Sequence, residues 1–200
     1  MTIQHQARAG RPRSEKAEKA IIEATLDLMA EGMGVAELSI EAIAARAGVG
    51  KTTIYRRWAN KEDLVVDALA TIREPLPPLA GESVRDDLIV LLDVMRREAG
   101  RHRDRCLMNM VMGETDRSQR IRERFIKIAL EPRRAAMRQV LARGVATGEL
   151  RPDLDLELGM ALLHGAMMSF TKWGPAGDLP EDLAERVVDH ALDGLRSPRA

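Results

Sequence analysis

The most chemically informative residues of the chain lie at positions 51–57, KTTIYRR, where hydrogen-bond donors replace the apolar side chains of a core helix. Lysine and arginine bind phosphate, threonine hydroxyls donate to phosphates or base edges, and tyrosine offers a hydroxyl and a flat ring. Apart from the tyrosine, Ile54 is the single apolar residue of the run. A helix formed by these residues would therefore be a surface element suited to binding nucleic acid.

Two short helices and a tight turn would position these donors. Ser39 is a favourable N-cap, and the helix after it places its apolar residues on one stripe, namely Ile40, Ile43, Ala44 and Ala47. Gly48 ends this helix, and a second helix follows almost at once, with Ile54 available to pack against the first. This is the helix-turn-helix arrangement, whose second helix fits the major groove of DNA. Asn60 then caps a third helix, with Asp63 placed to return the capping bond.

The distribution of charge supports this interpretation, although the net charge does not. The chain has 31 basic and 31 acidic residues, so its formal net charge is zero. Residues 42–61 nevertheless contain five basic residues and no acidic one. Such a local positive potential is what phosphate binding requires, whereas a solvated helix face is the alternative for a charge run. The residues predicted to bind DNA are Arg46, Lys51, Thr52, Thr53, Tyr55, Arg56, Arg57 and Lys61, of which the last three are expected to hold the DNA backbone.

Four positions in this region carry a resemblance to a known family: a small-residue turn, a tyrosine late in the second helix, a bulky aromatic after it, and a lysine that opens the third helix. They are Gly48, Tyr55, Trp58 and Lys61. With the basic lead GRPR at residues 10–13 and a helix predicted at residues 15–33, they make residues 10–69 similar to the N-terminal domain of the TetR family of one-component bacterial transcription repressors.

The resemblance implies a DNA-binding repressor whose C-terminal region binds a small effector between its helices. The family commonly has Phe or Tyr where this chain has Trp58, a difference that leaves the expected fold intact. It commonly has His or Lys where this chain has Arg56 and Arg57. The second difference suggests a different or more cation-dependent operator.

The same residues permit a rival interpretation as a nucleotide-binding loop. Residues 45–52, ARAGVGKT, satisfy a loosened phosphate-loop pattern, and residues 88–93, LIVLLD, imitate an apolar strand that ends in a magnesium-binding aspartate. That loop needs a buried strand entering it, whereas the segment before Ala45 has helical periodicity. Apolar residues around Asp93 also recur at intervals of three and four. A P-loop NTPase is therefore the remote alternative.

Composition favours a helical protein without catalytic chemistry. Aromatic residues make up only 2% of the chain, there are eleven methionines, and no long stretch alternates between apolar and polar residues. No nucleophile, base and orienting acid stand at a recognisable spacing, so we predict neither catalysis nor a cofactor. His102 and Cys106 could share a metal ion on a continuous helix, but two ligands make an incomplete site. Without a signal peptide or an apolar run long enough to cross a bilayer, the expectation is a cytoplasmic protein with no membrane partner.

A proline-rich break divides the chain after the third helix of the motif. Residues 73–83, REPLPPLAGES, hold three prolines and would interrupt any helix. The predicted organisation is all-α, with a flexible basic arm at 1–13, a three-helix domain with a helix-turn-helix at 14–72, and a C-terminal helical bundle for ligand binding and dimerisation at 73–200. Helices in that bundle are expected at residues 84–100, 103–114, 117–147 with a kink at Pro132, 155–173 and 180–196.

The helix predicted near the C-terminus should face a second copy of the chain. Residues 156–170 are apolar on nearly every side, so part of this surface needs a cover beyond the subunit core. A partner subunit is the economical cover, and a helix wholly buried in a monomer is the alternative. The predicted homodimer interface consists of Gly159, Leu162, Gly165, Ala166, Val187, Ala191 and Leu195. Two recognition helices about 34 Å apart would then read a palindromic operator in double-stranded DNA.

Methionines concentrate in the C-terminal two thirds of the chain and suggest a pocket, because flexible thioethers accommodate irregular apolar ligands. Ordinary core packing is the alternative for each of them, and a hydrogen-bonded histidine in the core is the alternative for His164. The residues predicted to line the pocket are Leu92, Met95, Met110, Phe125, Met137, His164 and Met168. The expected effector is a small apolar or amphipathic molecule. The competing hypothesis is a constitutive DNA-binding dimer, against which a cavity of a few hundred Å³ would argue.

Overall fold

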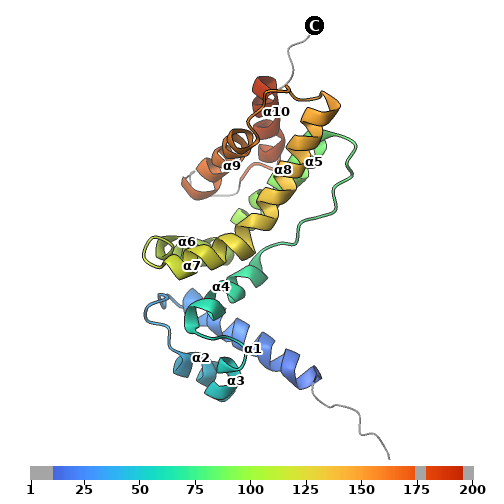
Figure 1. Cartoon of the computed structure of the whole chain (residues 1–200). Coiled ribbons are helices and arrows are strands. Elements are labelled where there is room, and N and C mark those ends of the chain that lie inside the picture. Colours follow the sequence, from blue (N-terminus) through green and yellow to red (C-terminus); the bar gives the residue numbers. More distant parts are fainter. Residues whose placement is uncertain (1–10, 174–178, 196–200) are drawn as a thin grey trace, which may run out of the picture. The chain divides into compact units, whose positions relative to one another are not determined.

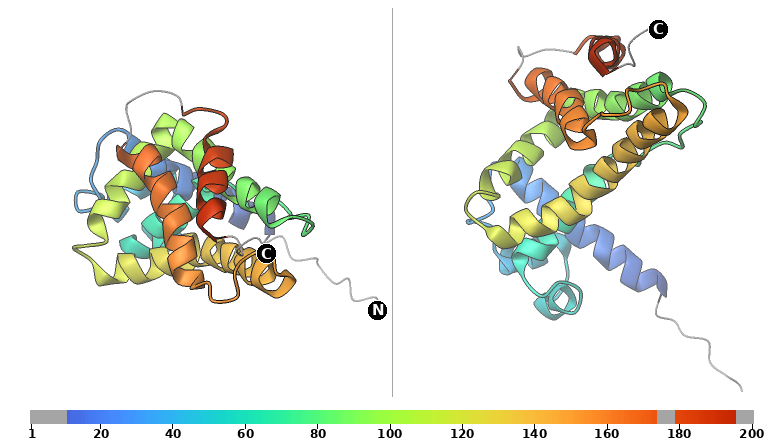
Figure 2. Two further views of the ribbon diagram at one scale, coloured as in Figure 1. Left: turned by 90° about the horizontal axis from the view of Figure 1, so that it is seen from above. Right: turned by 45° about the horizontal axis from the view of Figure 1, so that its top comes forward.

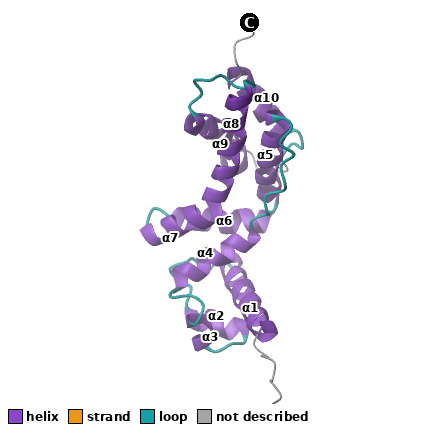
Figure 3. Ribbon diagram, turned by 45° about the vertical axis from the view of Figure 1, so that its right-hand side comes forward, coloured by secondary structure: helices purple, strands orange, loops and turns teal. Residues whose placement is uncertain are grey.

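The structure is a computed structural model that describes residues 11–173 and 179–195. Within these ranges every regular element is a helix (Figures 1 and 3), which confirms the all-α fold class. The elements are α1 (Arg11–Ala30), α2 (Ile40–Ala47), α3 (Lys51–Tyr55), α4 (Lys61–Ile72), α5 (Val84–Gly100), α6 (His102–Glu114), α7 (Gln119–Phe125), the π-helical segment η1 (Ile126–Leu130), α8 (Glu131–Thr147), α9 (Leu156–Trp173) and α10 (Leu183–Leu195).

These elements form two compact units. The first unit comprises Met1–Ile72 and Cys106–Arg124, and the second comprises Arg73–Arg105 and Phe125–Ala200. The proline-containing segment at residues 73–83 therefore begins the second unit, while most of α6 and nearly all of α7 belong to the first.

The helical assignment removes the structural basis of the nucleotide-binding alternative. Residues 45–52 run from the end of α2 into α3, and residues 88–93 lie inside α5. No strand enters or follows the glycine-containing segment in the described part of the chain. The segment that enters it is the helix α2, in place of the buried strand that a phosphate loop requires.

The first unit is built around α1. This helix packs against α2 and α4, and α2 packs against α3. Each element contributes an apolar side chain with no accessible surface, namely Ile21, Ile43, Ile54 and Leu64. The short α3 would not be stable alone in water, so its position depends on burying Ile54.

The first helix begins earlier than expected. Residues 15–33 were predicted as helix and residues 1–13 as an arm, whereas α1 spans Arg11–Ala30. Proline in a first helical turn removes an amide N–H that has no partner within the helix, so Pro12 does not prevent this earlier start. Residues 1–10, which hold the rest of the predicted arm, lie outside the described residues. The predicted end at residue 33 was wrong, because α1 ends at Ala30 and Gly32 adopts a positive φ of 99° in the turn that follows.

In the second unit, α5, α8, α9 and α10 pack against one another, and α9 and α10 lie side by side in Figure 2. Their shared core includes Leu88, Leu92, Leu141, Leu163 and Val188, none of which has accessible surface. α5 begins and ends where the sequence predicted. Its N-cap is Ser83, whose hydroxyl accepts a hydrogen bond from the Asp86 N–H at 3.2 Å.

The predicted helix at residues 117–147 is present but is not one α-helix. α7 ends at Phe125, the chain continues as η1, and α8 begins at Glu131. The irregularity therefore precedes Pro132 instead of centring on it. A proline has no N–H for the turn before it and clashes with the carbonyl group four residues earlier, and the wider π-helical turn relieves that clash. Segments of this kind often mark positions where a helix adjusts to function.

Gly144 provides a test of packing in the second unit. A Cβ atom at this position would lie 2.7 Å from Leu150 Cδ1 and 2.9 Å from Val84 Cγ2. Gly144→Ala is therefore expected to lower the free energy of unfolding by about 1–3 kcal/mol, although alanine favours an exposed helix by about 1 kcal/mol. The control is Gly113→Ala, because a Cβ atom there meets nothing within 4 Å. The measurement is urea unfolding followed by circular dichroism. A gain in stability in both variants would contradict the expectation.

Candidate nucleic-acid interface and cavity

The turn between α2 and α3 is fixed by local backbone chemistry. Gly48 adopts the left-handed conformation with φ 65°, and its N–H donates to the Ala45 carbonyl at 3.3 Å. The Val49 N–H donates to the Ala44 carbonyl at 3.0 Å, so the end of α2 has the two bonds of a Schellman motif. The cap at Ser39 is also present, since its hydroxyl accepts from the Ala42 N–H at 3.1 Å. These bonds set the direction in which α3 leaves α2.

The third helix of the motif is capped as expected, with one difference. The Asp63 N–H donates to Asn60 Oδ1 at 2.8 Å. The predicted return bond comes from the side-chain amide of Asn60, which donates to Asp63 Oδ2 at 3.3 Å, instead of from its backbone N–H. The Asp63 carboxylate also has further partners, which are described below.

α3 presents a polar surface while its one aliphatic side chain faces inward. Ile54 is fully buried, whereas the side chain of Tyr55 is 55% exposed. Lys51, Thr52 and Arg56 are also exposed, and Thr53 is half-buried. A tyrosine with this exposure adds little to the core, so its ring and hydroxyl are available to a partner.

Three of the basic side chains differ in how they are paired. Arg46 donates to both carboxylate oxygens of Glu31 at 2.7 and 2.8 Å, and this hydrogen bonding lowers the pKa of Glu31. Lys51 lies 2.8 Å from Glu41 Oε1. Both pairs are largely exposed, so phosphate groups could replace these carboxylates at little cost. Arg56 is exposed and forms no ion pair with any acidic side chain that the structure describes.

Two other predicted DNA contacts are engaged within the protein. The Lys61 ammonium group donates to the carbonyl oxygens of Leu38 at 2.8 Å and Ala36 at 3.2 Å. Arg57 has only 13% of its side chain exposed, lies 3.5 Å from a carboxylate oxygen of Glu18, and donates to the Thr53 carbonyl in α3 at 3.2 Å. Their geometry suits them to holding the loop before α2 and the middle of α1 more than to binding phosphate. The sequence missed this because carbonyl partners more than twenty residues away leave no local pattern.

The different surroundings of Arg56 and Lys61 lead to a test of whether each side chain binds phosphate. Arg56→Ala is expected to weaken binding to all DNA sequences and to reduce the slope of log affinity against log salt by about 1 for each recognition helix. Lys61→Met should leave that slope unchanged and instead lower the free energy of unfolding by about 1–3 kcal/mol. Fluorescence anisotropy over a salt series, with urea unfolding of both variants, separates the outcomes. Equal flattening of the slope by Lys61→Met would restore its assignment to phosphate.

An ionic cluster that was not predicted joins α4 to α7. Arg120 donates to Asp63 Oδ2 at 3.0 Å, and Arg124 donates to both oxygens of Asp67 at 2.7 and 2.8 Å. The indole N–H of Trp58 donates to Asp67 Oδ2 at 2.9 Å. The hydrogen bond from Arg120 and the charge of Arg124 lower the pKa of Asp63, although its burial opposes this. One signal was present in the sequence, because the two aspartates and the two arginines are each four residues apart and so share a helix face.

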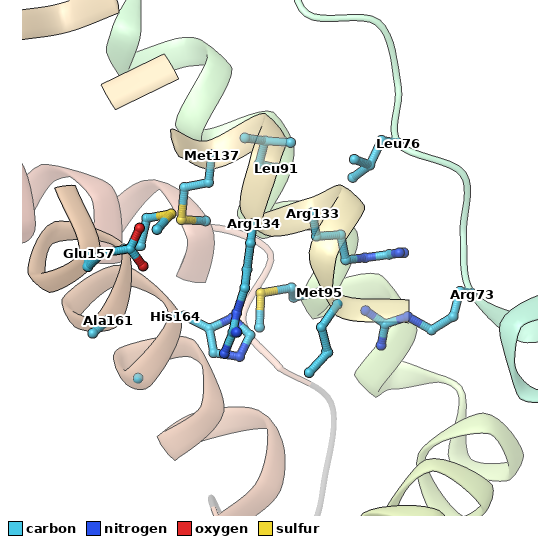
Figure 4. Close-up of a pocket in the computed structure, with 13 residues that line it drawn as sticks. Arg73, Leu76, Leu91, Met95, Arg133, Arg134, Met137, Glu157, Ala161 and His164 are labelled. Carbon is cyan, nitrogen blue, oxygen red and sulfur yellow. The ribbon is translucent and has the colours of Figure 1, made fainter. Parts of the chain in front are cut away.

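The second unit contains a cavity of about 380 Å³, shown in Figure 4. Its lining combines apolar side chains with an unusual number of basic groups. The lining residues are Arg73, Leu76, Leu91, Met95, Leu130, Arg133, Arg134, Met137, Glu157, Met160, Ala161, His164 and Gly165. A cavity of this size lies in the range of natural small-molecule sites.

The cavity coincides with part of the predicted pocket. Met95, Met137 and His164 line it. Four other predicted residues do not. Leu92 and Phe125 are buried in the packing of the core, Met110 lies on α6 in the first unit, and Met168 lies beyond the lining on α9. The sequence argument depended on methionines and therefore missed the arginines.

Two of these arginines share one carboxylate. Arg73 Nη1 lies 3.1 Å from Glu98 Oε2, and Arg133 Nη2 lies 2.7 Å from Glu98 Oε1. The Nε atoms of Arg73 and Arg133 are buried and have no hydrogen-bond partner among the described residues. Burial lowers the pKa of Arg73, an effect that Glu98 opposes and Arg133 increases. Burial, followed by the charges of Arg134 and Arg73, also lowers the pKa of His164.

An apolar surface remains uncovered on α9. Four large side chains lie exposed on this helix, namely Leu158 at 55%, Leu162 at 52%, Phe170 at 45% and Trp173 at 72%. Their spacing places them on one side of the helix. We call Leu158, Leu162, Phe170 and Trp173 the α9 face. Most globular chains cover so large an apolar group with another molecule.

The α9 face differs from the dimer interface that the sequence predicted. Leu162 and Gly165 are exposed, and a Cβ atom at Gly165 would meet nothing within 4 Å. Gly159 and Val187 are buried inside the chain, the former against Leu141. Ala166 and Ala191 pack at the edge of the same core, and the side chain of Leu195 lies outside the described residues. Small size had been taken to indicate close approach of a partner, whereas at Gly159 it serves packing within the subunit.

The described residues contain no cluster of three or more potential metal ligands among their histidine, cysteine and acidic side chains, and Cys106 is exposed. Across the same part of the chain, no helix combines the length and apolar character needed to cross a membrane.

Comparisons with known proteins agree with the helix-turn-helix geometry. Residues 21–68 match the family described as bacterial regulatory proteins, tetR family, and residues 78–191 match the tetracyclin repressor-like C-terminal domain. The chain is 32% identical over 198 residues to the uncharacterized HTH-type transcriptional regulator YdeS of Bacillus subtilis (strain 168), covering 98% of each chain. It is 29% identical over 195 residues to the DNA-binding transcriptional repressor TetR of Mycobacteroides abscessus, covering 94% of this chain and 98% of that one.

A solved structure shows the same fold. The transcriptional regulator FadR from Bacillus subtilis, in complex with stearoyl-CoA, matches with a TM-score of 0.69 and 20% identity, covering 89% of this chain and 99% of that chain. The two matched families cover an N-terminal helix-turn-helix region and most of the C-terminal helices. The chain therefore belongs to the TetR family of transcriptional regulators.

Proposed function

We propose that the protein is a homodimeric repressor that binds a palindromic operator through α3 and leaves it when a small molecule occupies the cavity of the second unit. The observation that carries the proposal is the exposed polar surface of α3, with Tyr55 at its centre, on a turn that fits the helix-turn-helix motif. The proposal assigns no catalytic step to the chain. Its place of action is the cytoplasm, where the operator lies.

The exposed residues of α3 divide between base edges and phosphates. Lys51, Thr52 and Tyr55 lie on the exposed surface and are assigned to base edges or the phosphates beside them, with the half-buried Thr53 at their margin. Arg46 and Arg56 are assigned to the phosphate backbone, the former by exchanging Glu31 for phosphate. Arg57 and Lys61 support the motif from within. Loss of Tyr55 should therefore change sequence preference more than overall affinity.

A symmetric dimer supplies the second recognition helix. The α9 face offers four large exposed apolar side chains on one helix. A second copy of the chain is the simplest partner that could cover them. Two copies related by a twofold axis would place two α3 helices on one side of the duplex.

The covalent path of the chain connects the cavity to the DNA-binding unit in two places. Arg73 of the cavity directly follows the last residue of α4. Leu130 and Arg133 of the cavity follow α7 through the π-helical segment, and α7 is bonded to α4 by Arg120 and Arg124. An effector that favours one arrangement of these helices would thus bias the spacing of the recognition helices. Its effect cannot exceed its difference in affinity for the two arrangements.

A constitutive dimer without an effector is the second candidate. The cavity of about 380 Å³ favours the responsive form, because a module that only dimerises has no need of such a space. The FadR structure from Bacillus subtilis holds stearoyl-CoA, so a protein of this fold takes a small ligand.

Selection of bound fragments from a random pool of duplex DNA tests the proposal. We expect enrichment of inverted repeats whose half-sites lie about one helical turn apart, or a multiple of it. The double variant Tyr55→Ala with Arg56→Ala, altered only at exposed positions of the motif, should enrich nothing. Recovery of single half-sites would contradict the dimer, and absence of enrichment by the unaltered protein would contradict the assignment of α3.

A further inference from the structure

We propose that the cavity of the second unit takes a small organic anion, with its apolar body among the leucines and methionines and its anionic head, a carboxylate or a phosphate, at Arg73, Arg133 and Arg134. Only the consequence of binding, which is release of the operator, rests on the proposed function. The binding itself is independent of DNA.

The apolar part of the cavity fits a flexible hydrocarbon or ring body. Leu91 and Met95 from α5, Met137 from α8 and Met160 from α9 contribute to its walls, and Leu76 contributes from the segment before α5. Figure 4 shows the thioether side chains and the basic groups around the same space. Methionine side chains adjust their rotamers to irregular shapes, so this wall selects for apolar character more than for a rigid outline.

The basic groups of the lining are incompletely neutralised by the protein. Arg73 and Arg133 share the single carboxylate of Glu98, so this trio retains one positive charge. Arg134 is exposed and forms no ion pair with any acidic side chain in the described residues. The one acidic residue of the lining, Glu157, accepts hydrogen bonds from Arg138 at 2.9 and 2.7 Å and is therefore occupied. The surplus of charge in the cavity is positive.

The buried guanidinium groups add to the positive charge around the cavity. The Nε groups of Arg73 and Arg133 have almost no accessible surface and no protein acceptor in the described part of the chain. A buried donor without a partner costs free energy, and for a charged group the cost is larger. The positive field that these groups create also acts on His164, whose pKa is lowered by burial and by the charges of Arg134 and Arg73. An anionic head would neutralise this field, whereas a neutral ligand would not.

Calorimetric titration of the unaltered protein, without DNA, tests the inference with paired probes. Octanoate, decanoate and dodecanoate are compared with the alcohols of equal chain length, and decanoyl-CoA is included because its anionic groups are phosphates. We expect decanoate or one of its neighbours to bind at least about tenfold more tightly than the matching alcohol, as loss of a charged hydrogen bond implies. Arg134→Ala should weaken carboxylate binding by about tenfold and leave the alcohol unchanged. The control variant is Arg186→Ala on α10, a surface arginine outside the cavity lining.

The outcomes separate this inference from the proposed function. Preference for decanoyl-CoA over decanoate, lost in Arg134→Ala, assigns the head group to phosphate, and the reverse preference assigns it to a carboxylate. Equal binding of acid and alcohol, equal weakening of both by Arg134→Ala, or no binding of any anionic probe overturns the inference. Anisotropy with a selected operator is measured in parallel. An anion that binds through Arg134 without releasing the operator supports the inference and contradicts release by an effector. Release of the operator by the alcohols alone supports release by an effector and contradicts the inference.

Discussion

Replacement of Leu162 by glutamate is expected to convert the proposed dimer to monomers and to lower operator affinity by about 100-fold or more. The side chain of Leu162 is 52% exposed and lies between Leu158 and Phe170 on the α9 face. A carboxylate placed there stays hydrated in the monomer, but in the dimer it would be buried against apolar groups with no partner. A monomer holds one recognition helix, so it loses the gain that comes from binding two half-sites at once.

Analytical ultracentrifugation and operator binding measure the two effects on the same preparation. Ala146→Glu is the matched control, because it adds the same charge at an exposed position on a different helix, α8. Both variants should retain the helical circular dichroism of the parent, since neither position is buried. If Leu162→Glu stays dimeric and binds operator normally, the α9 face is not the dimer interface.

The DNA-binding motif could be predicted because residues close together in the sequence determine each of its helix boundaries. Ser39 caps α2 by accepting from the N–H three residues later, Gly48 ends it with a positive φ, and Asn60 caps α4. Each signal involves residues within one helical turn, so the chain specifies the turn before any distant contact forms. The same locality explains why the helix at residues 84–100 was placed correctly, with its cap at Ser83.

The cavity could not be predicted in the same way, because it depends on distant groups. Arg73 and Arg133 are brought to one carboxylate, Glu98, by the packing of separate elements. Nothing within a helical turn of either arginine indicates that pairing. Methionine content was an unreliable guide, since Met95 and Met137 line the cavity whereas Met110 belongs to the other unit.

Glycines on α9 illustrate the same limit. Gly159 and Gly165 lie on one helix and looked equally suited to a partner helix, yet a Cβ atom would lie 3.4 Å from Leu141 at the first and near nothing at the second. The side of the helix that faces the core is set by α5, α8 and α10 together. Periodicity gives the stripe, but the neighbours decide which side of an all-apolar helix is covered.

The second large effect concerns Trp58, where this chain departs from the Phe or Tyr common in the family. Trp58 is 5% exposed, and its indole N–H donates to Asp67 Oδ2 at 2.9 Å. Trp58→Ala is expected to lower the free energy of unfolding of the first unit by about 3–5 kcal/mol, through the cavity that it leaves. Operator binding should be lost with it, because the chain from α3 to α4 would no longer be held. Urea unfolding followed by far-ultraviolet circular dichroism, together with operator binding, measures both effects.

Trp58→Phe separates the packing of the ring from its hydrogen bond. Phenylalanine fills most of the same space, and Asp67 keeps its two bonds from Arg124 at 2.7 and 2.8 Å, so this half-buried carboxylate is not left without a donor. The cost should therefore be about 1 kcal/mol, with operator binding retained. If the phenylalanine variant is as unstable as the alanine variant, the hydrogen bond to Asp67 matters more than the volume of the ring. In that case the ionic cluster between α4 and α7, and not the apolar core beneath α3, would be what holds the motif in place.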